Sequence, residues 1–339
     1  MRADLHVHSN ASDGTDPPAE VMRRAAQAGL DVVALTDHDT VAGHAQARQA
    51  LPAPLILVPG MELSCRLDGP DQGQQSRGVP GGSSPRGQQS RGVPGGMKGS
   101  SPRGQQSRGV PGGSSPRGQQ SVHLLAYLFD PDQPDLAAEL SRIRDDRVLR
   151  AQAMVRRLAE LGVDISWDQV AAIAGPAVIG RPHIARAMAA SGAIASPREA
   201  FTRDWIADGG RAYVGRYALA PVRAIGLVRG AGGVAVLAHP RASRDTLVSD
   251  EQIAGLAAVG LAGVEVFHPD QTAAERAGLL ALATDLGLVA TGGSDDHGTL
   301  TGHRIGCETT DAGAYQALTS RVPGGVSRTR EDLPLGYGS

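Results

Sequence analysis

The chain has 339 residues, of which 41% are hydrophobic but only 3% aromatic, so its core must consist mainly of Ala, Val, Leu and Ile. Two cysteines give no disulfide framework, and no apolar run approaches the roughly 18 residues that would span a membrane. The formal net charge is −2, but residues 72–120 carry seven basic and no acidic side chains, which leaves −9 for the remainder and argues against a broad nucleic-acid-binding surface.

The chain opens with a charged, histidine-bearing strand instead of an apolar leader, so we expect a cytoplasmic protein. In Leu5-His6-Val7-His8, side chains two positions apart project from the same face of a strand, and His6 and His8 therefore form a pair. Asp13 follows in a turn-rich loop. Imidazole and carboxylate groups together suit Zn²⁺, Mn²⁺ or Fe²⁺.

Helices and strands then alternate. We predict a helix over residues 18–28, a strand over 31–39, a helix over 41–50 and a strand over 55–62. The first of these strands ends in Asp37, His38 and Asp39, and the second ends in Glu62. Unbroken apolar strands separated by helices are typical of a parallel sheet covered by helices, in which chemistry gathers at the carboxyl ends of the strands.

Residues 72–121 are a low-complexity insertion. The unit GQQSRGVPGGSSPR begins at residue 73 and recurs with small changes, and valine is its one aliphatic side chain apart from proline. Such a composition cannot bury a core, and we expect it to be disordered. Without it, residues 65–69 and 121–129 would form a hairpin that carries His123. A basic arm that tethers RNA is the alternative interpretation.

A long helix is predicted over residues 136–161. Arg147 occupies a position in its apolar stripe, and Arg144 lies one turn earlier on the neighbouring row. A guanidinium in an apolar stripe needs an anion or water, and bidentate arginine suits phosphate. A salt bridge from this pair to Asp145 or Asp146 is nearly as plausible.

Residues 163–217 form a compact, mostly helical insertion, after which the alternation of strands and helices resumes. Further strands end at His239, at His268, and at Asp295 with His297. His239 and His268 each precede a proline, which favours an extended backbone at both histidines. His44 and His303 lie at no strand end, and we expect both on the surface. No structure is predicted for the polar, Gly-rich tail.

Seven of the ten histidines fall at the ends of predicted strands, a coincidence that isolated surface histidines do not explain. The motifs are His6-Val-His8-Ser, Ser12-Asp13-Gly14, Thr36-Asp-His38-Asp-Thr, Gly60-Met-Glu62-Leu-Ser, Val122-His123-Leu-Leu, Ala238-His239-Pro240 and Gly293-Ser-Asp295-Asp-His297-Gly. Together they resemble the PHP (polymerase and histidinol phosphatase) superfamily. Arg181-Pro182-His183 inside a helical insertion resembles the branch of nucleoside 3′,5′-bisphosphate phosphatases and 5′→3′ exoribonucleases.

This resemblance implies an α/β fold, a distorted (βα)7 barrel that holds two or three divalent metal ions and hydrolyses phosphoesters. Mn²⁺ is the ion expected first, with Zn²⁺ or Fe²⁺ as alternatives. The domains would be a barrel of residues 1–71, 122–162 and 218–310, the repeat insertion of 72–121, the helical insertion of 163–217 and a flexible tail of 311–339.

The resemblance also implies a ligand set. One ion would be held by His6, His8, Glu62 and Asp295, a second by Glu62, His123 and His239, and a third by Asp13, His38 and His297. Glu62, Asp295 and His297 would then be the catalytic residues. Substrate contacts are expected from Arg144, Arg147, Arg181, His183 and His268.

We therefore expect a metal-dependent phosphoesterase that acts on a small nucleotide with two phosphates or on the 5′ end of RNA, with no membrane and no obligate protein partner. Histidinol-phosphate phosphatase is a second enzymatic interpretation. A regulatory metal-binding module without catalysis is the alternative of another class. An amidohydrolase with a carbamylated lysine is disfavoured, because Lys98 in the repeat is the one lysine of the chain.

Overall fold

The structure is a computed structural model that describes residues 1–68, 119–175, 177–242 and 247–322. The predicted repeat insertion, together with the disorder expected of it, falls outside the described residues. Its last three positions, 119–121, are an exception, because they belong to a strand. Within the described part of the chain, no helix combines the length and the apolar character that crossing a bilayer requires.

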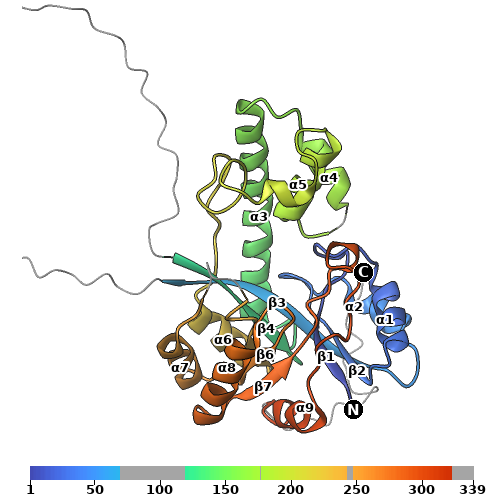
Figure 1. The fold of residues 1–339 in the computed structure, drawn as a ribbon, viewed down its shortest axis with the longest axis vertical. Coiled ribbons are helices and arrows are strands. Elements are labelled where there is room, and N and C mark those ends of the chain that lie inside the picture. The colour runs from blue at the N-terminus through green and yellow to red at the C-terminus, as the bar shows by residue number, and fades with distance from the viewer. Residues whose placement is uncertain (69–118, 176, 243–246, 323–339) are drawn as a thin grey trace, which may run out of the picture.

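One sheet of seven strands follows the chain order and curls into a nearly closed barrel (Figure 1), which confirms the predicted α/β barrel. The strands are β1 (Ala3–Val7), β2 (Val32–Leu35), β3 (Ile56–Asp68), β4 (Gln119–Tyr127), β5 (Val234–Leu237), β6 (Gly263–Phe267) and β7 (Val289–Gly292). All neighbouring strands are parallel except β4, which is antiparallel to both β3 and β5.

Strand β3 changes partner along its length. Residues 56–59 pair in parallel with β2, whereas residues 60–68 pair with β4 in a register that sets Ser64 opposite His123. The prediction that this strand ends at Glu62 is therefore wrong, since the strand continues for six more residues as one arm of a hairpin. The two arms end at Asp68 and Gln119, so they enclose the insertion except for its last three residues.

The barrel closes between β1 and the loop after β7. The amide of Asp295 donates to the carbonyl of His6 (2.8 Å), and the amide of His8 donates to the carbonyl of Asp296 (2.9 Å). Gly293 permits this approach, because a Cβ at that position would lie 2.4 Å from the Cβ of His6. Closure thus sets the first and the last sequence motifs side by side.

Helices pack around the barrel and across one of its ends. They are α1 (Pro18–Gln27), α2 (His44–Gln49), α6 (Pro221–Gly230), α7 (Asp250–Ala258), α8 (Ala273–Asp285) and α9 (Ala312–Thr319). Leu318 of α9 is buried against the apolar residues inside the barrel, among them Ala3 and Val289. The predicted flexible tail is therefore wrong for residues 311–322, and residues 323–339 lie outside the described part of the chain.

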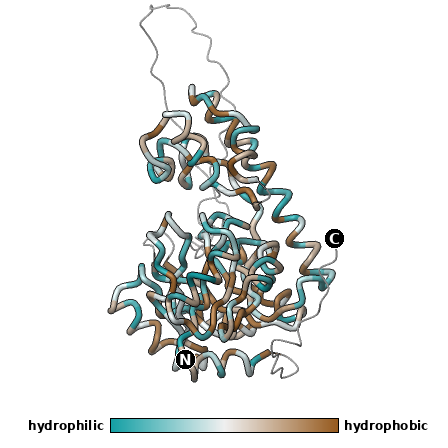
Figure 2. The backbone as a smooth tube through the Cα atoms, turned by 90° about the vertical axis from the view of Figure 1, so that its right-hand side faces the viewer, coloured by the Kyte–Doolittle hydropathy of each residue, from teal (hydrophilic) through white to brown (hydrophobic). Residues whose placement is uncertain are grey.

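A helical unit stands beside the barrel on a long helix (Figures 1 and 2). The helices concerned are α3 (Pro134–Glu160), α4 (Trp167–Ala174), α5 (Arg181–Ala190) and a 3₁₀ turn, η1 (Pro197–Ala200). The first half of α3 contributes Leu136 and Leu140 to the barrel core, whereas its second half contributes Met154 and Leu158 to a separate core with the insertion. We call residues 163–217 the cap.

Candidate active site

The histidine pair at the end of β1 lies at the centre of the site. His6 Nε2 and His8 Nε2 are 3.1 Å apart, and each lies 3.1–3.3 Å from Glu62 Oε2 and Asp295 Oδ1. Two N–H groups could not face each other at this distance, so at least one nitrogen directs a lone pair at the centre. Atoms that bind one ion at about 2.1 Å lie about 3.0–3.5 Å from each other, so these four atoms fit a divalent cation.

Glu62 connects this group to a second one. Its Oε2 atom faces the β1 pair and His38 Nδ1 (3.2 Å), whereas its Oε1 atom lies 2.7 Å from His123 Nδ1 and 3.1 Å from His239 Nε2. The side chain is only 1% exposed. A buried carboxylate whose two oxygens face different sets of histidines is placed to bridge two cations.

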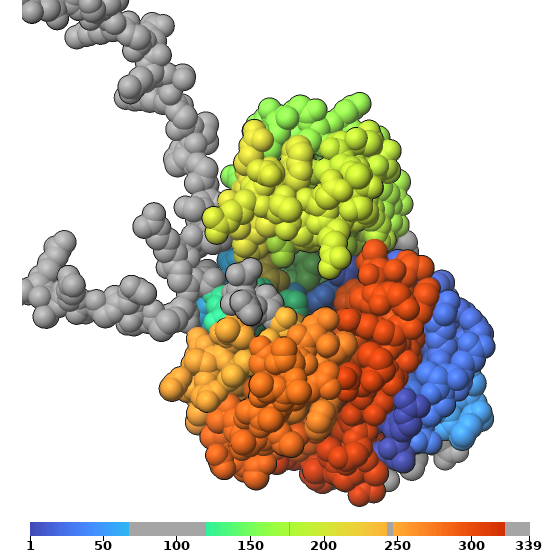
Figure 3. Space-filling model, viewed as in Figure 1, coloured from blue at the N-terminus to red at the C-terminus, as the bar shows by residue number. Residues whose placement is uncertain are grey.

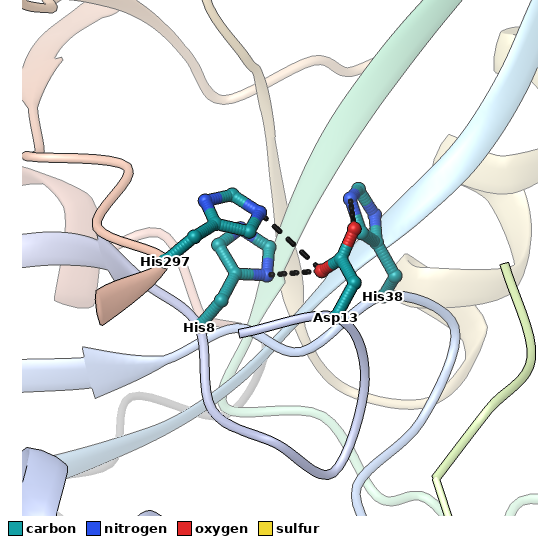
Figure 4. A group of neighbouring side chains, drawn as sticks. All are labelled: His8, Asp13, His38 and His297. Carbon is teal, nitrogen blue, oxygen red and sulfur yellow. Dashed lines mark ion pairs between the residues drawn. The ribbon is translucent and has the colours of Figure 1, made fainter. Parts of the chain in front are cut away.

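A third group surrounds Asp13 (Figure 4). Asp13 Oδ1 lies 3.3 Å from His297 Nε2 and 4.0 Å from His8 Nδ1, and Asp13 Oδ2 lies 3.8 Å from His38 Nε2. His8 Nδ1 is buried and has no hydrogen-bond partner among the described residues. An unpaired buried nitrogen beside a carboxylate fits a bound cation at this group as well.

The donor atoms therefore fall into three groups that suit metal ions. The groups are His6, His8, Glu62 and Asp295; His38, Glu62 and His123; and His8, Asp13, His38 and His297. His239 joins the second group through its contact with Glu62. All the ligands are nitrogen or oxygen donors, a set that suits Mn²⁺, Zn²⁺ or Fe²⁺. All nine ligands implied by the resemblance thus lie together, although their roles stay a proposal.

Two of the predicted ligands hold the protonation state that binds a cation. Burial alone would raise the pKa of the Asp295 carboxyl, but His6 and His297 lower it well below its usual range. Burial lowers the pKa of His38 to about 4, in spite of Glu62 and Asp13 nearby. At neutral pH the aspartate is therefore ionised and His38 is neutral, which are the forms that coordinate metals. By contrast, burial would lower the pKa of His8, but Asp295 and Glu62 raise it to about 10, so a cation would have to displace a proton there.

The backbone is unusual at two of the predicted ligands and at Asp39, which follows a third. Asp39, His239 and Asp295 have positive φ angles of 54°, 27° and 48°, which residues other than glycine seldom adopt. The extended backbone expected at His239 is therefore wrong, although Pro240 follows it. Such conformations cost free energy and persist where the surrounding structure fixes them, as it does at the closely packed ends of these strands.

Two buried carboxylates hold the predicted ligands in place, and neither was predicted from the sequence. Glu265 of β6 accepts hydrogen bonds from His6 Nδ1 (3.0 Å) and from the amide of His239 (2.8 Å). Asp4 of β1 accepts from the amides of Ser294 (2.9 Å) and Gly306 (2.8 Å), and burial raises its pKa to about 6. The available signal was a lone carboxylate inside an apolar strand, in Gly-Val-Glu-Val-Phe and Ala-Asp-Leu respectively.

A cavity lies between the predicted metal ligands and the cap, and Figure 3 shows the hollow between cap and barrel. Its wall includes Asp13, His38 and His123 on the barrel side. Four arginines also line it, namely Arg147, Arg150, Arg181 and Arg216. The arginines make this cavity suited to an anionic ligand.

Two of these arginines have no carboxylate partner within hydrogen-bond or ion-pair distance among the described residues. Arg150 donates to the carbonyl of Val214, and Arg216 donates to the carbonyl of Cys65 and the hydroxyl of Ser121. Burial, then the neighbouring arginines, lower the pKa of Arg150 to about 9. The same causes lower the pKa of Arg216 to about 10. Clustered cations without paired anions favour the binding of an anionic ligand.

The other two arginines of the cavity are paired. Arg147 Nε donates to Asp39 Oδ2 (2.9 Å), so its partner is neither of the two aspartates beside it in the helix. Arg181 Nη1 donates to Asp208 Oδ1 (2.8 Å). The predicted substrate residue Arg144 lies outside the lining of this cavity.

The two predicted substrate histidines lie elsewhere. His183 is buried, accepts from the amide of Gly180 (3.0 Å), and lines a second cavity with Asn10 and Arg186. His268 is 1% exposed, and its Nε2 lies 3.3 Å from Asp295 Oδ2, beside a predicted ligand.

His44 and His303 were both expected at the surface. His303 is exposed, but His44 is 2% exposed and its Nε2 lies 2.8 Å from the carbonyl of Gly60. The prediction for His44 is therefore wrong, because this side chain points inward from α2 and joins it to β3.

Comparisons with known proteins agree with this geometry. The model of the PHP domain matches residues 4–77. The chain is 30% identical over 297 residues to the 3′,5′-nucleoside bisphosphate phosphatase of Chromobacterium violaceum, covering 87% of this chain and 86% of that protein. It is 29% identical to a 5′-3′ exoribonuclease of Haemophilus influenzae, covering 87% and 89%.

Among solved structures, one from Bifidobacterium adolescentis that is assigned as a metal-dependent phosphoesterase superposes with a TM-score of 0.70 at 30% identity, covering 94% of this chain and 96% of that one. These relatives confirm the resemblance that the sequence motifs indicated. The chain belongs to the PHP family and is a metal-dependent phosphoesterase.

Proposed function

We propose that this enzyme hydrolyses a phosphate ester of a nucleotide that carries a second phosphate. The leading candidate is a nucleoside 3′,5′-bisphosphate. The observation that carries this proposal is the pair of cations without carboxylate partners, Arg150 and Arg216, in the cavity that adjoins the metal ligands. One phosphate would be cleaved at the ligand groups, while the other would meet these guanidinium groups.

The chain supplies the framework for hydrolysis. Two or three divalent ions, with Mn²⁺ proposed first, would supply Lewis acidity that makes a water nucleophilic and balances charge on the leaving oxygen. Glu62 and Asp295 would hold these ions through buried carboxylates, and His297 with Asp13 would complete the group nearest the cap. The arginines would orient the substrate so that its phosphorus faces the attacking water.

The 5′ end of RNA is a second candidate, because it also presents two neighbouring phosphates, and one relative is an exoribonuclease. The acidic charge of the chain outside residues 72–120 favours a small nucleotide over a long strand. Histidinol phosphate would leave the arginine side of the cavity without an anion, which makes it the weakest of the three candidates.

The test is hydrolysis of three substrates by the Mn²⁺-reconstituted enzyme: adenosine 3′,5′-bisphosphate, a 5′-phosphorylated oligoribonucleotide and histidinol phosphate. We expect the highest kcat/KM for the bisphosphate. Arg216→Met should raise KM for the bisphosphate at least about tenfold, since a hydrogen bond between charged groups is worth about 1.5–3 kcal/mol. It should leave KM nearly unchanged for whichever of 3′-AMP and 5′-AMP the enzyme hydrolyses, because that monophosphate carries the cleaved phosphate alone.

Arg144→Met is the matched control, because this arginine lies outside the cavity. A preference for histidinol phosphate, or equal losses for the hydrolysed monophosphate and the bisphosphate in Arg216→Met, would contradict the proposal. Equal losses in Arg144→Met and Arg216→Met would show that the effect is one of overall charge.

A further inference from the structure

The cavity has an apolar part that the phosphates do not account for. Val178, Pro182 and Phe201 of the cap line the same cavity as the four arginines. Phe201 is 42% exposed and is the one aromatic side chain among the exposed large hydrophobic residues of the described chain. A protein with so few aromatic residues presents one of them to a site that otherwise binds anions.

The local fold directs Phe201 away from the cap core. It follows the 3₁₀ turn η1, and its amide donates to the carbonyl of Arg198 (3.2 Å). The flanking Ala200 and Ile206 are fully buried in the cap core, which therefore closes without the phenylalanine ring. Packing of the cap does not explain a phenylalanine at this position.

Arg181 lies beside the ring of Phe201. Its guanidinium carbon lies 5.9 Å from the centroid of Phe201, and its Nη1 is held by Asp208 at 2.8 Å. A guanidinium at this distance contributes a weak cation–π attraction that favours one position of the ring. Much of the surface of Phe201 stays accessible beside this contact.

We propose that Phe201, with Pro182 and Val178, forms the site on which the nucleobase of the substrate stacks. This inference rests on the proposed function and names the part of the substrate that the arginines and the metal ligands leave unassigned. Nucleobases are flat and apolar on their faces, so an exposed aromatic ring suits them, and stacking accepts every base. The enzyme should therefore prefer nucleotides to other bisphosphates, with little preference among the four bases.

The test compares a nucleoside bisphosphate with its abasic analogue, 1-deoxyribose 3,5-bisphosphate, in wild type and in Phe201→Ala. Loss of one stacking contact corresponds to about a 5- to 150-fold change in affinity. We expect Phe201→Ala to raise KM for adenosine 3′,5′-bisphosphate within this range, with kcat nearly unchanged and with no effect on the abasic analogue. Phe201→Trp should restore KM.

Leu149→Ala is the matched control, because Leu149 is 64% exposed on α3 and lies outside the cavity. Equal effects of Phe201→Ala on both substrates, or no effect on either, would overturn the inference. Binding of 2-aminopurine riboside 5′-monophosphate, followed by fluorescence quenching, gives a readout independent of bisphosphate hydrolysis. If wild type quenches this probe and Phe201→Ala does not, the stacking site stands even if the bisphosphate proves to be the wrong substrate.

Discussion

Arg147 of α3 forms an ion pair with Asp39, the residue that follows the predicted ligand His38. Asp39 is fully buried, and its other oxygen accepts from the amide of Ser64 at 2.8 Å. Burial would raise the pKa of Asp39, but Arg147 lowers it. The pair therefore ties the long helix to the strand of Glu62 and fixes the loop that carries His38.

Removing one member of this pair should destabilise the fold. Arg147→Ala leaves the Asp39 carboxylate buried and unpaired, and we expect the free energy of unfolding to fall by about 3 kcal/mol. Chemical denaturation of Arg147→Ala, Asp39→Asn and the double variant measures the coupling. The double variant should lose less than the two single losses added together. Additive losses would contradict a direct interaction between the two side chains.

Glu62→Gln should abolish turnover. An amide offers one oxygen and an NH₂ group that cannot coordinate, whereas both carboxylate oxygens of Glu62 face histidines. With Mn²⁺ supplied in excess, we expect kcat to fall at least about a hundredfold and the bound metal, measured by elemental analysis, to decrease. Glu251→Gln on the surface is the control. Unchanged turnover and metal content would remove Glu62 from the site.

Glu265→Gln tests whether the carboxylate that accepts a hydrogen bond from His6 Nδ1 supports metal binding. The loss of negative charge makes the imidazole a weaker ligand, and we expect metal affinity to fall by about 10- to 100-fold while the protein stays folded. Competition with a fluorescent chelator measures this affinity without reference to activity. Glu265→Leu, which also removes the hydrogen bond to the amide of His239, should lose more. Equal affinity in wild type and Glu265→Gln would assign this carboxylate to folding alone.

His44 should make stability depend on pH. Burial lowers its pKa, so the folded protein holds it neutral, whereas the unfolded chain takes up a proton below about pH 6.5. The contribution to stability is therefore present above pH 6.5 and is lost as the pH falls. We expect Tm to drop more steeply between pH 7 and pH 5 in wild type than in His44→Gln, which keeps the other nine histidines. Parallel Tm curves would be evidence that His44 keeps its ordinary pKa in the fold.

The repeat insertion should be dispensable. Its flanks, Asp68 and Gln119, are paired, so a two-residue Asn-Gly turn in place of residues 69–118 would suit the hairpin. We expect the shortened protein to keep its Tm within a few degrees, its bound Mn²⁺ and its kcat/KM on the nucleotide, because loop closure depends only weakly on length. Selective loss of RNA-end cleavage at low salt would instead favour the basic tether.

The sequence predicted the features that short-range patterns encode. Apolar strands that lead into histidines and carboxylates indicated which residues would meet, because the strands of one sheet bring those ends together. The hairpin of β3 and β4 was also predicted once the repeat was set aside.

Features that depend on distant partners were not predictable in the same way. Arg147 and Asp39 are 108 positions apart, and nothing local distinguishes this partner from the aspartates beside Arg147. His44 is buried because its ring reaches a carbonyl on β3, which the pattern of α2 does not reveal. Helix α9 has one fully buried residue, too few for an amphipathic pattern, although Asp311 at its start is a recognisable N-cap.

Two hydrogen bonds join the cap to the loop that carries Ala11 and Asp13. The amide of Val178 donates to the carbonyl of Ala11 (3.1 Å), and Arg186 Nη2 donates to the carbonyl of Asp13 (2.7 Å). The cap therefore cannot swing away from the barrel without breaking these bonds or drawing Asp13 with it. A substrate bound by the cap and a cation bound at Asp13 would therefore be linked. Because linkage is reciprocal, each would change the binding free energy of the other by the same amount.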